Sequence, residues 1–230
     1  MNTINLRNDV RGHLSNYFDK YLTSEMVVYD IGCGPNPFSQ SLKAKVRKHV
    51  GVDIDNGFYE KGYIDLVGSA YDVPVEDAGA DAVISSQVLE HLEDPRKAIE
   101  ETARILKRGG YFLCSFPFLY PIHAAPHDYS RISEFYMKKM LMDSGLEVIE
   151  QNRIGGFWYI IGMYTGMYLQ AFDRGLFKKM KIVSVLSCVV RWLLFQIQKL
   201  ENTILNFCGK DAENFSSQWT VNYVIVAQKI

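Results

Sequence analysis

Two acidic residues and two glycines carry the first chemical signal in this sequence. Asp30 precedes Gly32 and Gly34 at the end of an apolar, β-prone run, and Asp53 follows at the tip of a second such run. Glycines directly after a strand let a ligand approach the backbone closely. An acidic residue at the tip of the next strand is placed to accept both hydroxyls of a ribose. The pattern therefore indicates a site for a nucleoside-containing cofactor.

The identity of that cofactor depends on two details. Pro37 stands where the dinucleotide fingerprint G-x-G-x-x-G requires its third glycine, which disfavours a nicotinamide-dependent oxidoreductase. Asp30 also adds a negative charge that would repel a pyrophosphate but attract an ammonium or sulfonium group. The charge favours S-adenosylmethionine, with NAD-dependent oxidation as the alternative.

Strands and helices must alternate to position these residues. The sequence predicts strands at 26–31, 48–53, 81–86, 110–116, 146–151 and 221–229, and helices at 4–22, 95–106 and 133–144. Such alternation is typical of a mostly parallel sheet with helices on both faces, which binds ligands at the carboxyl ends of its strands. We predict an α/β fold of this kind.

Residues 26–149 resemble the class I S-adenosylmethionine-dependent methyltransferases, in particular their type 11-like members. The D-x-G-x-G loop and the acidic residue Asp53 match, as does the block A-D-A-V-I-S-S-Q-V-L-E-H-L-E-D-P at 80–95. The run R-I-L-K-R-G-G at 104–110 is similar to the family's R-x-L-K-P-G-G. The resemblance implies a methyltransferase with a Rossmann-like, seven-stranded sheet.

The resemblance also implies which residues hold the cofactor. They are Asp30, Gly32, Cys33 and Gly34 at the methionine part, Asp53 at the ribose, Ile54 on the adenine, Ser69 and Ala70 at its edge, and Gln87 near the methionine end. Ser69 stands where the family often has Asp, and Asn36 where it often has a third glycine. Because Asn tolerates left-handed backbone geometry, the turn can form.

The loop after the strand at 110–116 holds the candidate catalytic groups. A hydroxyl acceptor needs a base, and we predict His127 for that role with Asp128 to orient it. We assign His123, Tyr129 and Arg131 to the substrate. The alternative is that His127, Asp128 and Arg131 brace the loop. No metal is expected, because Pro126 disfavours a helix that would align His123 with His127.

Glu90 and His91 form a second pair, for which we favour a role in fixing the turn after the strand at 81–86 over a role in catalysis. The run H-D-Y-x-R at 127–131 resembles a subgroup associated with polysaccharide and glycan synthesis. We therefore expect methyl transfer to a small-molecule or lipid-linked acceptor, foremost a glycan hydroxyl. A lipophilic quinone-like acceptor and a catalytically silent binding module are the alternatives.

An apolar insertion divides the chain. We predict a cofactor-binding domain at 1–153 and 216–230, and a helical hairpin at 154–215 before the last strand. Residues 156–207 contain six basic and two acidic side chains, a net charge of +4 in a chain whose total is −1. The hairpin could be a substrate lid, a homodimer contact or a surface that rests on an anionic membrane.

Composition limits the remaining classes. The near-neutral total charge disfavours nucleic acid as a partner. The four cysteines are far apart and form no C-x-x-C, and charges interrupt the first fifteen residues, where a signal peptide needs an apolar run. We expect a cytoplasmic protein, with the inner face of the membrane as a possible location.

Overall fold

The computed structural model describes residues 6–55, 63–172, 174, 181–211, 215 and 218–230. The described chain forms two compact units. One comprises Leu6–Asn152 with Asn222–Ile230, and the other is Arg153–Val221. The sequence analysis placed these boundaries at 153/154 and 215/216. The basic stretch at 173–181 lies outside the described residues except for Arg174 and Lys181.

A seven-stranded sheet forms the centre of the first unit. Its strands run in the order β3-β2-β1-β4-β5-β7-β6. The pairs β1 with β2, β1 with β4, β2 with β3 and β4 with β5 are parallel, and β5 with β7 is antiparallel. The predicted mostly parallel sheet is confirmed. The bounds are β1 Val27–Ile31, β2 Lys48–Asp53, β3 Leu66–Val67, β4 Ala80–Ser86, β5 Leu106–Pro117, β6 Leu146–Gly155 and β7 Thr220–Lys229.

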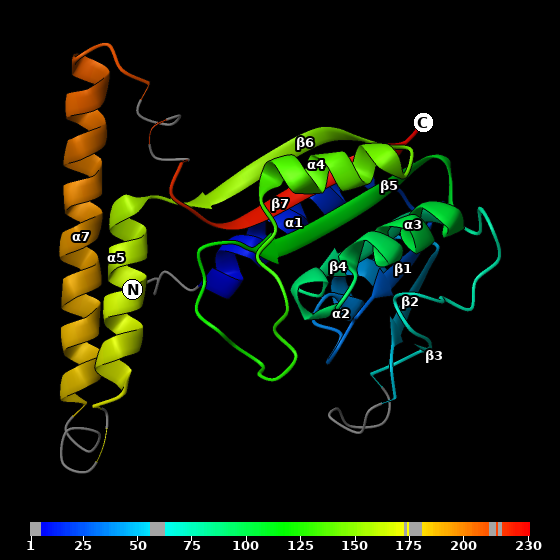
Figure 1. The fold of residues 1–230 in the computed structure, drawn as a ribbon, viewed down its shortest axis with the longest axis horizontal. Helices are drawn as coiled ribbons and strands as arrows, with labels where there is room; N and C mark the ends of the chain where they lie inside the picture. Colours follow the sequence, from blue (N-terminus) through cyan, green and yellow to red (C-terminus); the bar gives the residue numbers. More distant parts are fainter. Residues whose placement is uncertain (1–5, 56–62, 173, 175–180, 212–214, 216–217) are drawn as a thin grey trace. The chain divides into compact units, whose positions relative to one another are not determined.

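Helices cover both faces of this sheet (Figure 1), with α3 and α4 on one face and α1 on the other. Local signals begin them: the Asp94 side chain accepts a hydrogen bond from the N–H of Lys97, and Ser133 does the same for Tyr136. Gly145, with φ +76°, follows the last turn of α4. The bounds are α1 Leu6–Tyr21, α2 Ser39–Lys43, η1 Leu89–His91, α3 Pro95–Ile105 and α4 Glu134–Asp143.

Three short features do not follow from the predicted elements. The helix after the glycine loop, α2, has five residues and begins only at Ser39. Helix α3 stops at Ile105, and Gly109 lies inside β5 with φ +80°. Strand β3 was not predicted, because two residues are too few to produce an alternating pattern.

The second unit contains a helical hairpin. Helices α5, Phe157–Gln170, and α7, Ile182–Phe207, pack along each other (Figure 1). By length and composition alone, α7 is long and apolar enough to cross a membrane, and 12% of its most apolar window is buried. Gly166 is buried, yet a Cβ atom there would meet nothing within 4 Å. Two glycines at this spacing, here Gly162 and Gly166, are common where helices pack closely, but the open space shows that no such close contact is made at Gly166.

Candidate active site

A cavity of about 400 Å³ opens at the carboxyl ends of β1 and β4. Its walls come from the glycine loop after β1, the turn after β4, the loop after β5, one end of α1, and β7. The lining residues are Val10, Arg11, Asp30, Gly32, Cys33, Gly34, Pro35, Pro37, Phe38, Ser86, Gln87, His91, Tyr120, His123, Ala124 and Asn222. This is the sheet edge at which the sequence predicted a ligand.

The glycine loop has a backbone that few other residues can adopt. Gly32 and Gly34 have φ of +70° and +52°, and Asn36 has φ +50°, as its substitution for glycine required. A Cβ atom on Gly32 would lie 2.4 Å from the Val88 side chain. The loop therefore lies directly against the turn after β4, and the Val88 side chain occupies the place that a side chain on residue 32 would need.

Asp53 lies at the tip of β2, as predicted, but it already has backbone partners. Its Oδ2 accepts a 2.7 Å hydrogen bond from the N–H of Gly34, and its Oδ1 accepts one from Ile54. Asp53 ends β2, Ile54 follows it, and Ser69 and Ala70 follow β3. None of the four is among the described residues that line the cavity. Ile54 is 49% exposed, and Ser69 Oγ accepts a hydrogen bond from the N–H of Tyr71.

Asp30 is the carboxylate that lines the cavity. It is buried, and its Oδ2 has no hydrogen-bond partner among the described residues, although His49 Nε2 lies 3.8 Å away. Burial raises the pKa of Asp30, against the opposing effect of His49. Burial also raises the pKa of Cys33 to about 12, so its thiol is not a nucleophile at neutral pH.

These residues fit S-adenosylmethionine. A cation near Asp30 would compensate a buried carboxylate that lacks a hydrogen-bonding partner at one oxygen. Gly32 and Gly34 present backbone rather than side chains to the cavity, so the methionine part can approach the main chain there. Gln87 lines the same cavity. Its backbone is left-handed, with φ +58°, and its Nε2 donates a hydrogen bond to Ser115 Oγ.

The loop after β5 brings His123, rather than His127, to the cavity. The His123 N–H donates to Asp128 Oδ2 at 2.9 Å, and His123 Nδ1 lies 3.6 Å from the same oxygen. Arg131 binds both Asp128 oxygens, at 2.6 and 2.8 Å. The Arg131 guanidinium holds the pKa of Asp128 well below its usual range. Asp128 and Arg131 therefore brace the loop, the alternative considered above, and in doing so they fix the His123 imidazole.

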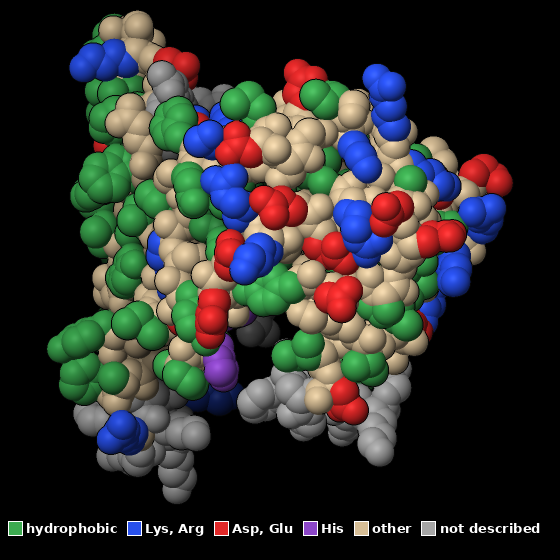
Figure 2. All heavy atoms as spheres, turned by 45° about the vertical axis from the view of Figure 1, so that its right-hand side comes forward, with side chains coloured by type: hydrophobic (Ala, Val, Ile, Leu, Met, Phe, Trp, Pro, Cys, Tyr) green, Lys and Arg blue, Asp and Glu red, His purple; other side chains and the backbone are tan. Residues whose placement is uncertain are grey.

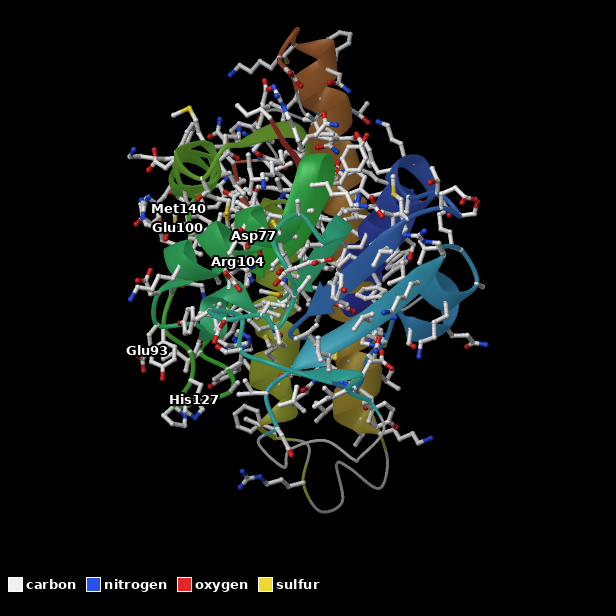
Figure 3. All side chains as sticks on the ribbon, turned by 90° about the vertical axis from the view of Figure 1, so that its right-hand side faces the viewer. Asp77, Glu93, Glu100, Arg104, His127 and Met140 are labelled. Carbon is white, nitrogen blue, oxygen red and sulfur yellow. The ribbon has the colours of Figure 1, made fainter. Side chains whose placement is uncertain are left out.

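His127 is exposed and is not among the described residues that line the cavity. Its Nδ1 contacts the Tyr129 hydroxyl at 3.2 Å, and Figure 3 shows its side chain directed away from the sheet. This placement does not support the prediction of His127 as the base. Tyr129 and Arg131 are likewise absent from the described lining, which leaves His123 as the one predicted substrate residue that reaches the cavity.

Glu90 lies directly behind His123. Its side chain is 1% exposed, neither carboxylate oxygen has a hydrogen-bond partner among the described residues, and Oε1 lies 3.8 Å from Nε2 of both His91 and His123. The Glu90 carboxylate raises the pKa of His123 above its ordinary value. Ligand atoms of these three residues fall within 4.8 Å of one another, so they could hold a metal ion, a set different from the His123–His127 pair considered above.

Glu90 and His91 also fix the local fold, as the sequence suggested. The Glu90 carbonyl accepts hydrogen bonds from the N–H groups of Tyr129 and Ser130, and His91 Nδ1 lies 2.6 Å from the His127 carbonyl oxygen. These contacts tie the turn after β4 to the loop after β5. Sequence reasoning did not place His91, Tyr120 or Asn222 at the cavity. Asn222 could have been recognised from the sequence, because it is a polar residue within an apolar strand. In the structure its buried Oδ1 has no hydrogen-bond partner among the described residues.

The fold is that of the Rossmann-like methyltransferases. Residues 29–114 match the family model described as a methyltransferase domain. The chain is also similar to a SAM-dependent methyltransferase from Archaeoglobus fulgidus, with a TM-score of 0.61 and 18% identity over 97% of this chain and 94% of that one.

Two curated relatives carry more specific names. A ubiquinone biosynthesis O-methyltransferase of Nitrosomonas europaea is 24% identical over 68% of this chain and 82% of its own length. A demethylmenaquinone methyltransferase of Clavibacter sepedonicus is 32% identical over 39% and 40%. Three other relatives are matched over 48%, 58% and 62% of their length. The chain is thus similar to S-adenosylmethionine-dependent methyltransferases, and it spans less than two thirds of the length of several of these relatives.

Proposed function

We propose that this protein methylates a hydroxyl oxygen of a lipid-linked acceptor, with His123 as the general base. The observation that carries the proposal is the position of His123, in the same cavity as Asp30 and the glycine loop. S-adenosylmethionine supplies an electrophilic methyl group on a sulfonium. The acceptor oxygen forms a bond to that carbon as the carbon–sulfur bond breaks, and the hydroxyl proton must leave the oxygen.

His123 has the surroundings of a base. Its Nδ1 lies 3.3 Å from the Pro121 carbonyl, 3.6 Å from Asp128 Oδ2 and 3.5 Å from Arg131 Nη2. Because the carbonyl is the nearest of these and can only accept, the proton belongs on Nδ1, which leaves Nε2 to take the acceptor's proton. The imidazolium that results is stabilised by Glu90, 3.8 Å from Nε2. Alignment by the cavity supplies the remainder of the catalysis.

A lipophilic quinone-like acceptor is now the first candidate. The two relatives named above act in ubiquinone or menaquinone chemistry by their names. The H-D-Y-x-R run, which favoured a glycan, is explained by the loop itself, since Asp128 pairs with Arg131 and Tyr129 with His127. A glycan hydroxyl is the second candidate, supported by that resemblance.

The test is transfer of radiolabelled methyl from S-adenosylmethionine to two acceptor sets, hydroxylated isoprenoid quinones and polyisoprenyl-linked sugars. We expect label in the quinone set, and a loss of at least about a hundredfold in His123→Ala. His127→Ala is the matched control and should keep its rate. Label only in the sugar set would reverse the order of acceptors. Cofactor binding without transfer to either would favour a silent module.

A further inference from the structure

We infer that the α5–α7 hairpin is a docking surface for an anionic lipid bilayer, on which it lies parallel to the membrane plane. The main evidence is a row of exposed apolar side chains on α7, which we call the exposed stripe. Its members recur at steps of three and four and all lie on one helix face: Ile182, Leu186, Val189, Leu193, Ile197, Leu200, Ile204 and Phe207.

The neighbouring face of α7, one residue further along the helix at each step, has the burial expected for its contact with α5. Val183 and Ser187 are buried, and positions 190, 194, 198, 201 and 205 are intermediate, again at steps of three and four. The exposed stripe is therefore a second apolar face, additional to the one that packs in the hairpin. Phe207 is 91% and Leu200 61% exposed. Contiguous apolar surface of this kind marks a protein or membrane contact.

Helix α5 adds a shorter row of the same kind. Ile161, Tyr164 and Tyr168 on α5, and Phe172 just after its end, are exposed at steps of three and four. Tyrosine and tryptophan are enriched at the boundary between headgroups and acyl chains, because their rings are amphipathic. Trp192, 60% exposed, flanks the exposed stripe on α7. Figure 2 shows hydrophobic side chains along the hairpin at the left edge of the view.

Charge favours a lipid surface over a second copy of this chain. Arg174, Lys181 and Lys199 are exposed, and the sequence of the hairpin has a net charge of +4. Two such surfaces would repel each other, whereas anionic headgroups attract basic side chains next to an apolar face. Basic residues beside an apolar helix face are the composition of an interfacial helix.

The connectivity favours a helix on the membrane over one across it. Strands β6 and β7, which flank the hairpin, are neighbours in one sheet, so both ends of the hairpin are on the same side of any bilayer. If α7 crossed the bilayer, α5 would also have to cross it so that the chain could return to the same side. Helix α5 has 14 residues, a length of about 21 Å, against a hydrocarbon core of about 30 Å.

The experiment is flotation of the full chain with vesicles, without cofactor or acceptor. We expect binding to phosphatidylcholine vesicles that contain phosphatidylglycerol, weaker binding at high salt, and little binding to phosphatidylcholine alone. Leu193→Glu with Leu200→Glu should weaken binding at least about tenfold. The control, Ser184→Glu with Asn206→Glu, adds the same charge at exposed positions outside the exposed stripe and should lose much less.

Circular dichroism and S-adenosylhomocysteine affinity confirm that each variant is folded, and they separate this inference from the proposed methyl transfer. The inference is overturned if the wild type fails to float with anionic vesicles, or if both double variants lose binding equally. A solution dimer that Leu193→Glu with Leu200→Glu dissociates, without any loss of vesicle binding, would assign the exposed stripe to a second copy.

Discussion

Asp53 Oδ2 accepts a 2.7 Å hydrogen bond from the backbone N–H of Gly34, which joins the tip of β2 to the glycine loop after β1. The same carboxylate accepts the Ile54 N–H through Oδ1. Each oxygen has a further lone pair, so Asp53 can hold the loop and still accept hydroxyls of a ribose. One side chain thus organises the loop and serves the cofactor.

Asp53→Ala should therefore weaken S-adenosylhomocysteine binding at least about tenfold, which corresponds to about 1.4 kcal/mol. Both the ribose acceptor and the Gly34 contact are lost. Asp55→Ala removes an exposed carboxylate two residues further on and is the matched control. Calorimetric titration of both variants checks the prediction. An unchanged affinity in Asp53→Ala would mean that the tip of β2 does not meet the cofactor.

Gly32→Ala should lower the free energy of unfolding by about 2 kcal/mol or more, because it combines φ +70° with a Cβ atom 2.4 Å from Val88. Gly109→Ala is the control for backbone strain alone, since Gly109 has φ +80° but nothing within 4 Å, and should lose about 1 kcal/mol. Urea denaturation measures both. Val88→Ala should partly rescue Gly32→Ala, and the absence of any rescue would contradict the steric explanation.

Asp30→Asn should stabilise the cofactor-free protein while it weakens cofactor binding. Because the folded-state pKa of Asp30 is raised, its contribution to stability is fully present below the unfolded pKa and decreases as pH rises through the folded value. Asn has no charge to bury, so we expect a higher Tm at pH 8, by a few degrees, and a smaller difference at pH 4. Thermal melts at both pH values test this, and a lower Tm at pH 8 would contradict the assignment of an uncompensated buried carboxylate.

The pH dependence of turnover should report His123. Its pKa is raised above the ordinary value of 6.5, so the neutral imidazole that can act as a base forms only as pH rises through that higher value. The rate should therefore increase with pH in the range above 6.5. Glu90→Gln removes the neighbouring negative charge and should move this increase to lower pH. The exposed Glu93→Gln is the control. Equal profiles for wild type and Glu90→Gln would show that Glu90 does not act on the base.

Sequence reasoning predicted the sheet and the glycine loop because both depend on local patterns. Apolar runs fixed the strands, and the need for positive φ identified Gly32, Gly34 and Asn36. The choice between His123 and His127 could not be made in this way. It depends on how the loop after β5 folds back, and that fold is set by the Asp128–Arg131 ion pair and by the Glu90 carbonyl, which is distant in sequence.

The central claim is that the cavity beside Asp30 and His123 binds S-adenosylmethionine and places His123 at its reacting end. Calorimetric titration of S-adenosylmethionine and S-adenosylhomocysteine into the wild type, His123→Ala and Asp30→Asn tests it most directly. We predict binding of one ligand per chain to the wild type, retained affinity in His123→Ala, and a loss in Asp30→Asn. No binding of either ligand to the wild type at roughly 1 mM, the upper end of usual KM values, would contradict the account.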